Sequence, residues 1–209
     1  MDCCDRGGEI RTRGTAPIDR ETTRLSHEKN PRLLFIPTAS SDSERYWKHA
    51  QEYFGTFLKC KTDVLFLIKE QPSKERIRRR ILLADIIYVG GGNTLQMMRI
   101  WRRLGVDKLL ISAYENGTVL SGIGAGAICW FDSGHSDSMS FYNPRKWNYI
   151  NVRGLAARAH KWNTLPTLQQ HDPQNPSKEA LPGDESEDWG HRNRDREQLR
   201  DRVLRRAVL

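Results

Sequence analysis

The sequence has little cysteine and no long apolar run, and each absence excludes a class of protein. Its four cysteines (Cys3, Cys4, Cys60 and Cys129) show neither the spacing of zinc ligands nor that of a disulfide framework. No apolar run approaches the roughly 20 residues that cross a bilayer. The N-terminus, which begins Met1-Asp2-Cys3, lacks the apolar core of a signal peptide. We therefore expect a cytoplasmic protein without a membrane partner.

The formal net charge of +8 is the one compositional feature that could indicate a nucleic-acid partner. The basic residues are mixed with acidic ones, as in Lys74-Glu75-Arg76, and the sequence holds no basic recognition motif or array of aromatic residues for stacking. We expect no nucleic-acid partner. A basic binding surface stays a weaker alternative, testable by salt-dependent retention.

Strand and helix patterns alternate between residues 31 and 131, which predicts an α/β fold with a mostly parallel sheet in a three-layer sandwich. Apolar runs predict strands, and Ser73, Thr94 and Gly105 mark helix boundaries. Met98 and Trp101 could suggest a cofactor pocket, but their helical spacing favours core packing. The expected strands are 33–37, 62–68, 86–89 and 118–122, and the expected helices are 43–58, 73–82, 94–104 and 107–116.

The most informative stretch is TVLSGIGAGAI at residues 118–128, an apolar strand that runs through a glycine-rich corner into a helix. It has the form of the Gly-x-Ser-x-Gly nucleophile elbow, in which the middle residue projects its side chain from a strained turn. Gly122 and Gly126 stand where backbone crowding at such a turn requires glycine. The middle residue is Gly124, so the attacking atom is missing.

Two glycine motifs, GGGNT at residues 90–94 and GIGAGA at residues 122–127, each follow a predicted strand. With these motifs, residues 7–155 resemble the peptidase E (aspartyl dipeptidase) family of serine peptidases, which has a class I glutamine-amidotransferase-like fold. The resemblance implies a Ser-His-Asp/Glu hydrolase that removes N-terminal aspartate from small peptides by acyl-enzyme chemistry, without a metal or other cofactor.

The resemblance also implies roles for particular residues. The family's serine corresponds to Gly124. The backbone N–H of Ala125, with one from Gly91 or Gly92, resembles an oxyanion hole. Asp137 is the best match for the acidic member of the triad, and a solvated loop aspartate is the alternative reading.

The family's histidine stands in a Pro-His-Tyr or Pro-His-Phe segment, and this sequence has none. His171 lies in the corresponding region, but its surroundings are polar and show no strand pattern. His135 is close to the elbow in sequence, although a surface loop position is favoured. Cys129 follows the corner inside the helix, so we interpret it as a buried structural thiol rather than a substitute nucleophile.

Residues 156–209 differ in composition from the predicted α/β domain at residues 7–155. They hold 19 charged residues in 54 and only eight Leu, Ile, Val or Phe, a composition typical of a disordered tail with at most a weak helix at residues 196–209. We expect the domain to be incomplete, with its first strand and its C-terminal strands lost. Unpaired sheet edges would then leave it marginally stable and prone to aggregate.

A shift of reading frame would explain both ends. Read one base later, suitable codons for residues 165–169 give Cys-Pro-His-Phe or Cys-Pro-His-Tyr, and those for residues 190–199 give an apolar strand. Residues 1–6 likewise give Trp-Ile-Val-Ala-Ile-Gly. An unrelated natural tail is the alternative, and the coding DNA decides between the two.

We therefore expect a serine hydrolase by descent that is inactive. The alternative is a non-catalytic protein that binds a small acidic peptide. The sequence does not indicate an oligomeric state.

Overall fold

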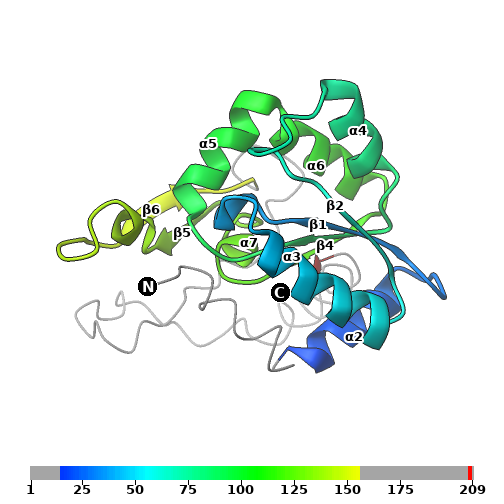
Figure 1. The fold of residues 1–209 in the computed structure, drawn as a ribbon. Helices are drawn as coiled ribbons and strands as arrows, with labels where there is room; N and C mark the ends of the chain where they lie inside the picture. The colour runs from blue at the N-terminus through cyan, green and yellow to red at the C-terminus, as the bar shows by residue number, and fades with distance from the viewer. Residues whose placement is uncertain (1–14, 156–206, 209) are drawn as a thin grey trace, which may run out of the picture.

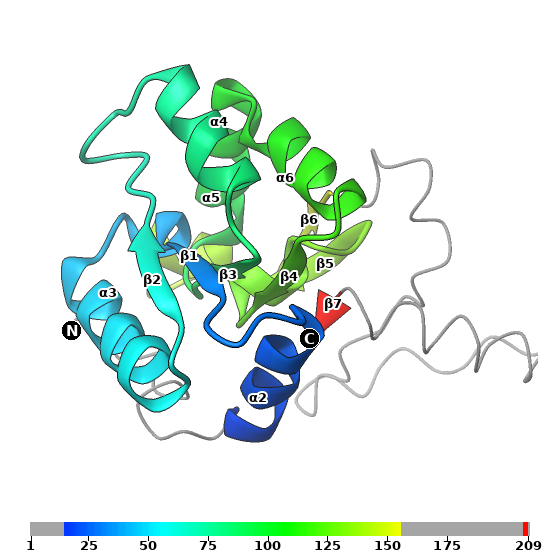
Figure 2. The ribbon, with the colours of Figure 1, turned by 90° about the vertical axis from the view of Figure 1, so that its right-hand side faces the viewer.

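The computed structural model describes residues 15–155 and 207–208 (Figure 1). Their centre is a parallel sheet in the order β2-β1-β3-β4-β7 (Figure 2). Its strands are β1 (Arg32–Ile36), β2 (Lys61–Val64), β3 (Ile86–Val89), β4 (Val119–Gly122) and the short β7 (Ala207–Val208). The crossovers that connect β1, β2, β3 and β4 contain helices, as the alternating sequence pattern predicts.

Helices cover both faces of the sheet, so the predicted three-layer α/β fold is confirmed. One face carries α4, α5 and α6, and the other carries α2 and α3 (Figures 1 and 2). The helices are α2 (Ala16–Leu25), α3 (Glu44–Ala50) with its π-helical continuation η3 (Gln51–Phe57), α4 (Lys74–Leu82), α5 (Thr94–Leu104) and α6 (Val106–Glu115).

The core has two halves because neighbouring residues of a strand face opposite sides of the sheet. In β1, Leu33 and Phe35 pack with the aromatic residues of α3 and η3, whereas Leu34 and Ile36 pack with α4, α5 and α6. All four side chains are at most 2% exposed. This burial on both faces explains why the strand is an unbroken apolar run rather than an alternating one.

Side-chain caps confirm the predicted starts of two helices, α3 and α4. The hydroxyls of Ser43 and Ser73 accept the N–H groups of Tyr46 and Arg76, three residues on. Gly105 ends α5 with a left-handed backbone (φ 74°). Met98 and Trp101 are fully buried in the core, as their spacing predicts.

The second strand is shorter than predicted: it ends at Val64, not at residue 68. Asp42 explains the difference, because its carboxylate accepts the N–H groups of Ile68 (2.5 Å) and Lys69 (3.1 Å). These two amides therefore bond to a side chain from the turn after β1 instead of continuing the sheet.

At the outer edge of β2, the backbone polar groups of Val64 are hydrogen-bonded to side chains of the same chain. The Val64 N–H donates to the Asp63 carboxylate (2.8 Å), and the Val64 carbonyl oxygen accepts from the Arg80 guanidinium. Arg80 also pairs with the Asp63 carboxylate (3.4 Å). Blocked edge groups of this kind oppose pairing with a foreign strand.

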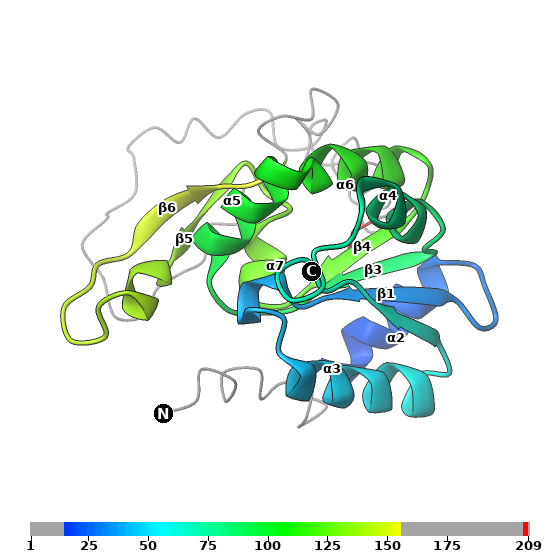
Figure 3. The same cartoon turned by 45° about the horizontal axis from the view of Figure 1, so that its top comes forward.

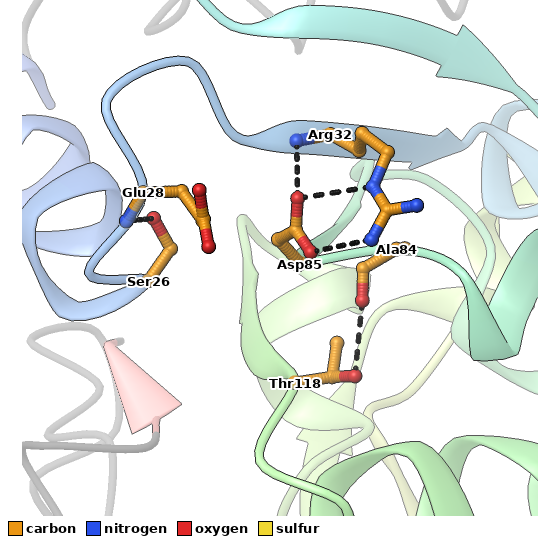
Figure 4. A network of polar contacts seen from close by, with 6 residues as sticks. All are labelled: Ser26, Glu28, Arg32, Ala84, Asp85 and Thr118. Atoms are coloured by element: carbon orange, nitrogen blue, oxygen red, sulfur yellow. Dashed lines mark hydrogen bonds and ion pairs between the residues drawn. The ribbon is translucent and has the colours of Figure 1, made fainter.

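At the opposite end of the sheet from the glycine turns, an ion pair joins the start of β1 to the residue before β3 (Figure 4). The Arg32 guanidinium donates to both carboxylate oxygens of Asp85 (3.0 and 3.2 Å), and the Arg32 backbone N–H donates to the same group (2.8 Å). Beside it, the Thr118 hydroxyl donates to the Ala84 carbonyl (3.1 Å) and fixes the start of β4.

Most of residues 156–209, and residues 1–14, lie outside the described part. The predicted loss of a first strand, the predicted disorder of the tail and the frame-shift hypothesis therefore stay predictions there. Ala207 and Val208 are extended and pair in parallel with Leu120 and Ser121, where the sequence suggested at most a helix and a sheet without its C-terminal strands, so β4 has a C-terminal partner at these two residues. Within residues 15–155 and 207–208, no helix has the length and apolarity required to cross a membrane.

Candidate active site

The candidate site lies where three strands of the sheet end. The short 3-10 helix η2 (Thr38–Ser40) follows β1, the 90–92 turn follows β3, and the elbow at Gly124 follows β4. The turns are joined directly, since the Asn93 N–H donates to the Ala39 carbonyl (2.8 Å). Ligands of open α/β sheets bind at this carboxyl edge.

Gly124 has the strained backbone expected of an elbow nucleophile. Its dihedral angles are φ 56° and ψ −116°, outside the regions that residues with side chains normally occupy. The short helix α7 (Ala125–Ile128) begins at the next residue, and the Gly124 carbonyl accepts the N–H groups of Ala127 and Ile128 (3.0 Å each). Gly124 is itself exposed, so the apex of the turn faces solvent.

The glycines around the apex are required by close backbone contact, as the motif predicts. A Cβ on Gly122 would lie 2.6 Å from the Gly126 carbonyl oxygen, and one on Gly126 would lie 2.1 Å from that of Val89. At Gly124 the nearest atom to such a Cβ is the Cα of Gly91, at an ordinary contact distance of 3.6 Å. The apex therefore has space for a side chain that the sequence does not supply.

The 90–92 turn packs tightly against its neighbours. Gly92 has φ 138°, and a Cβ there would lie 2.2 Å from the Ala39 carbonyl oxygen. A Cβ on Gly91 would lie 3.3 Å from the carbonyl oxygen of Ile123, the residue before the apex. The turn and the elbow are therefore in contact through Gly91 and Ile123, although these two residues are far apart in sequence.

Backbone N–H groups at this contact are the donors that an oxyanion hole would need. Among the described residues, neither Gly92 nor Ala125 has an acceptor for its N–H in the backbone or side-chain hydrogen bonds. The Gly91 N–H instead donates to the Tyr46 hydroxyl (3.4 Å). The roles assigned to Gly91, Gly92 and Ala125 in stabilising an oxyanion stay predictions.

Asp137 belongs to a segment that is tied to the start of α5. It follows β5 (Ser133–Ser136) and precedes the 3-10 helix η4 (Ser138–Phe141). The buried hydroxyl of Ser136 bonds to Thr94 (3.0 Å) and Ser138 (2.8 Å), and the Ser138 hydroxyl accepts the Leu95 N–H (3.0 Å). Asp137 therefore stands between two residues anchored just after the 90–92 turn, and its role as the acidic member stays a prediction.

This segment continues into an antiparallel pair that is separate from the main sheet. β5 pairs with β6 (Ile150–Arg153), and Figure 3 shows the pair beyond one end of the sheet, beside α5. His135 lies on β5 opposite Asn151 and is exposed. The predicted surface position is confirmed, but it is on a strand and not in a loop.

Two further candidates from the sequence were Cys129 and His171, and the structure describes only the first. Cys129 is completely buried, its thiol donates to the Gly126 carbonyl (3.1 Å), and burial raises the pKa of that thiol. It is therefore a structural thiol, as expected. His171 lies outside the described residues. Within the described ranges, no three His, Cys, Asp or Glu side chains are grouped so that they could hold a metal ion.

Sequence reasoning missed two features of the site. The hydroxyl cluster of Thr94, Ser136 and Ser138 joins residues more than 40 positions apart, and Tyr46 reaches the 90–92 turn from α3. The alternation of serines in HSDSMS at residues 135–140 is the only signal that could have suggested the first.

Comparison with known proteins gives the family. The sequence model of peptidase family S51 matches residues 7–181. The uncharacterized peptidase YgaJ of Bacillus subtilis (strain 168) is 40% identical over 121 residues, 58% of this chain and 51% of that protein. The uncharacterized peptidase Lin0382 of Listeria innocua is 34% identical over 101 residues, 46% of each protein. The chain spans about half the length of these curated relatives.

One solved structure supports the fold of this chain. A peptidase from an acI-B1 Actinobacterium superposes with a TM-score of 0.53 at 18% identity, over 68% of this chain and 58% of that one. A structure described as a peptidase E protein, from Listeria monocytogenes EGD-e, has a TM-score of 0.48 at 22% identity, over 65% and 69% of the two chains. On the extent of the family match, together with the parallel sheet and its glycine turns, this chain belongs to peptidase family S51.

Proposed function

We propose that this chain descends from serine peptidases that cleave Asp-X dipeptides and is itself inactive as a peptidase. The observation that carries the proposal is the apex of the elbow: Gly124 keeps the strained, exposed backbone of a nucleophile and lacks the nucleophile. The space next to Gly91 supports the same interpretation, because a side chain would fit there.

The chemistry explains why one missing oxygen matters. In a serine peptidase the hydroxyl oxygen bonds to the scissile carbonyl carbon while its proton passes to a base. The amine then leaves with that proton, and water hydrolyses the ester. A hydrogen atom at Gly124 cannot form the ester. Peptidases stripped of their triad keep only a residual rate of roughly 10³- to 10⁴-fold over water.

A second element of the proposal is the base. The sequence lacks the family's Pro-His-Tyr or Pro-His-Phe segment, so we expect that a serine alone does not restore turnover. The oxyanion donors, Ala125 with Gly92 or Gly91, and the acid Asp137 would serve only a chain that also had this base.

Three proteins test the proposal: the unmodified chain, Gly124→Ser, and Gly124→Ala as a control with the same backbone strain and no hydroxyl. Each is treated with a fluorophosphonate and weighed intact by mass spectrometry, and each is assayed with an Asp-containing dipeptide. We expect no covalent adduct and no turnover in any of them. An adduct on the unmodified chain would overturn the proposal, and turnover by Gly124→Ser above that of Gly124→Ala would show that a base is present.

The alternative, non-catalytic binding of a small acidic peptide, is favoured by the exposed apex and by the N–H groups of Gly92 and Ala125, which lack acceptors among the described residues. Calorimetry with an Asp-containing dipeptide and its Asn counterpart tests it. Heat of binding for the first alone supports a peptide-binding protein, and no heat for either contradicts it.

We also propose a cytoplasmic location. The thiols of Cys60 and Cys129 are free and buried, and burial raises the pKa of Cys60 to about 12. Free thiols of this kind accord with a reducing compartment.

A further inference from the structure

Tyr46 is placed beside the candidate site by the turn that follows β1. Ser41 and Asp42 both have left-handed backbone conformations (φ 55° and 56°), which reverse the chain after η2. The Asp42 carboxylate holds this turn to the N–H groups of Ile68 and Lys69. Ser43 then caps α3 by accepting the Tyr46 N–H (3.3 Å), which puts Tyr46 in the first helical turn.

The ring of Tyr46 packs directly under the 90–92 turn. A Cβ on Gly90 would lie 2.7 Å from Cε1 of the ring, so the turn rests on its edge. The ring also meets Phe35 of β1 edge to face, with centroids 5.2 Å apart, and Tyr46 is only 7% exposed. Packing on both sides leaves the ring little freedom to move relative to the turn.

The hydroxyl of Tyr46 reaches the turn as well. It accepts the N–H of Gly91 at 3.4 Å, a long hydrogen bond. An amide that donates to a phenol oxygen is not available to a developing oxyanion unless that bond breaks. The N–H of Gly92, the next residue, has no acceptor among the described residues.

We infer that Tyr46 is a positioning residue of the site: it holds the 90–92 turn and occupies the Gly91 N–H, so that Gly92, and not Gly91, is the turn's donor beside Ala125. The inference rests on the proposed function only in taking this contact as the oxyanion site. It narrows a choice between two glycines that the sequence leaves open.

Amide hydrogen exchange, followed residue by residue by NMR on the full chain, tests the inference without any need for activity. Gly91 and Gly92 are both half-buried and adjacent in sequence, so their amides are a matched pair. In the unmodified chain we expect the Gly91 amide to exchange roughly fivefold more slowly than that of Gly92, as one net hydrogen bond would give. Equal rates would overturn the inference.

The variant Tyr46→Phe removes only the hydroxyl oxygen. We expect exchange at Gly91 to speed up roughly fivefold, with Gly92 unchanged. The matched control is Tyr53→Phe, which removes a phenol oxygen bonded to Asp19 (2.9 Å) on the same helical segment. A Tyr46→Phe variant with unchanged Gly91 exchange, or equal acceleration in Tyr53→Phe, would overturn the inference. The exchange rates at Gly91 and Gly92 test the role of Tyr46 even if the unmodified chain proves to be an active peptidase, because the measurement does not depend on activity.

Discussion

Gly126 and Val89 approach so closely that a Cβ on the glycine would lie 2.1 Å from the carbonyl oxygen of the valine. The contact joins the first turn of α7 to the end of β3, and both partners are backbone. Backbone at this depth cannot move aside as the end of a long side chain can. The contact therefore fixes where the elbow helix starts relative to the sheet.

We expect Gly126→Ala to lower the free energy of unfolding by about 3 kcal/mol or more, because the new methyl group forces two backbone segments apart. Urea denaturation measures the loss. Gly117→Ala is the control: Gly117 has a positive φ (94°), which Gly126 does not have, but a Cβ there meets nothing within 4 Å. Its cost should be only about 1 kcal/mol, and equal losses for the two variants would contradict the role of the contact.

A thiol placed at the apex should be reactive. Gly124→Cys should fold with a cost of about 1–2 kcal/mol for its positive φ, and its exposed thiol should react with iodoacetamide about 100-fold faster than the buried Cys129. Site-resolved mass spectrometry after timed labelling measures both rates in one protein. If residue 124 reacted as slowly as Cys129, the apex would not be open to solvent.

The buried Asp19 should make stability fall as the pH rises. Burial raises the pKa of Asp19 from 3.8, although hydrogen bonds from Thr15 and Tyr53 oppose this rise. The native state then keeps the proton to a higher pH than the unfolded chain does. Stability is therefore lost from pH 3.8 up to the raised pKa, by about 1.4 kcal/mol for each pH unit between the two values.

Asp19→Asn keeps an acceptor oxygen and removes the titration. The difference in unfolding free energy, variant minus unmodified chain, should therefore increase with pH through this range. Urea denaturation at a series of pH values provides the curve. A difference that does not vary with pH would mean that Asp19 has its ordinary pKa in the folded protein.

Asp85 should make stability change with pH in the direction opposite to that expected for Asp19. Its hydrogen bonds with Arg32 lower its pKa from 3.8, so its contribution is present above pH 3.8 and is lost as the pH falls through the lowered value. Arg32 is half exposed, which limits the contribution to about 1 kcal/mol. Asp85→Asn should be less stable than the unmodified chain at neutral pH and equal to it in acid, in the same titration. If Asp85→Asn were still less stable than the unmodified chain in acid, the Arg32–Asp85 pair would stabilise the fold through packing and not through charge.

Local patterns were enough to predict much of this fold. The apolar run at residues 33–37 gives β1, and Ser73 and Gly105 mark the helix ends they were expected to mark. The crowding at Gly122 and Gly126 also follows from sequence, since glycine is the one residue that such a corner accepts.

The rest depends on contacts between distant residues. The Asp42 carboxylate accepts hydrogen bonds from backbone amides 26 and 27 positions away, and β2 is shorter as a result. The Tyr46 hydroxyl accepts a hydrogen bond from the N–H of Gly91, 45 positions away. The periodicity and spacing of residues along the sequence do not predict such long-range hydrogen bonds, because these bonds form only once the strands are assembled. For the same reason the sequence could name Gly91 and Gly92 together but could not choose between them.

The blocked edge of β2 has a consequence for how this molecule meets its own copies. With the N–H and carbonyl of Val64 held by Asp63 and Arg80, an approaching strand would have to displace a charged pair before forming its first ladder bond there. Any assembly of several chains should therefore use side-chain surfaces, and not a continuous sheet running through β2, to hold its subunits together.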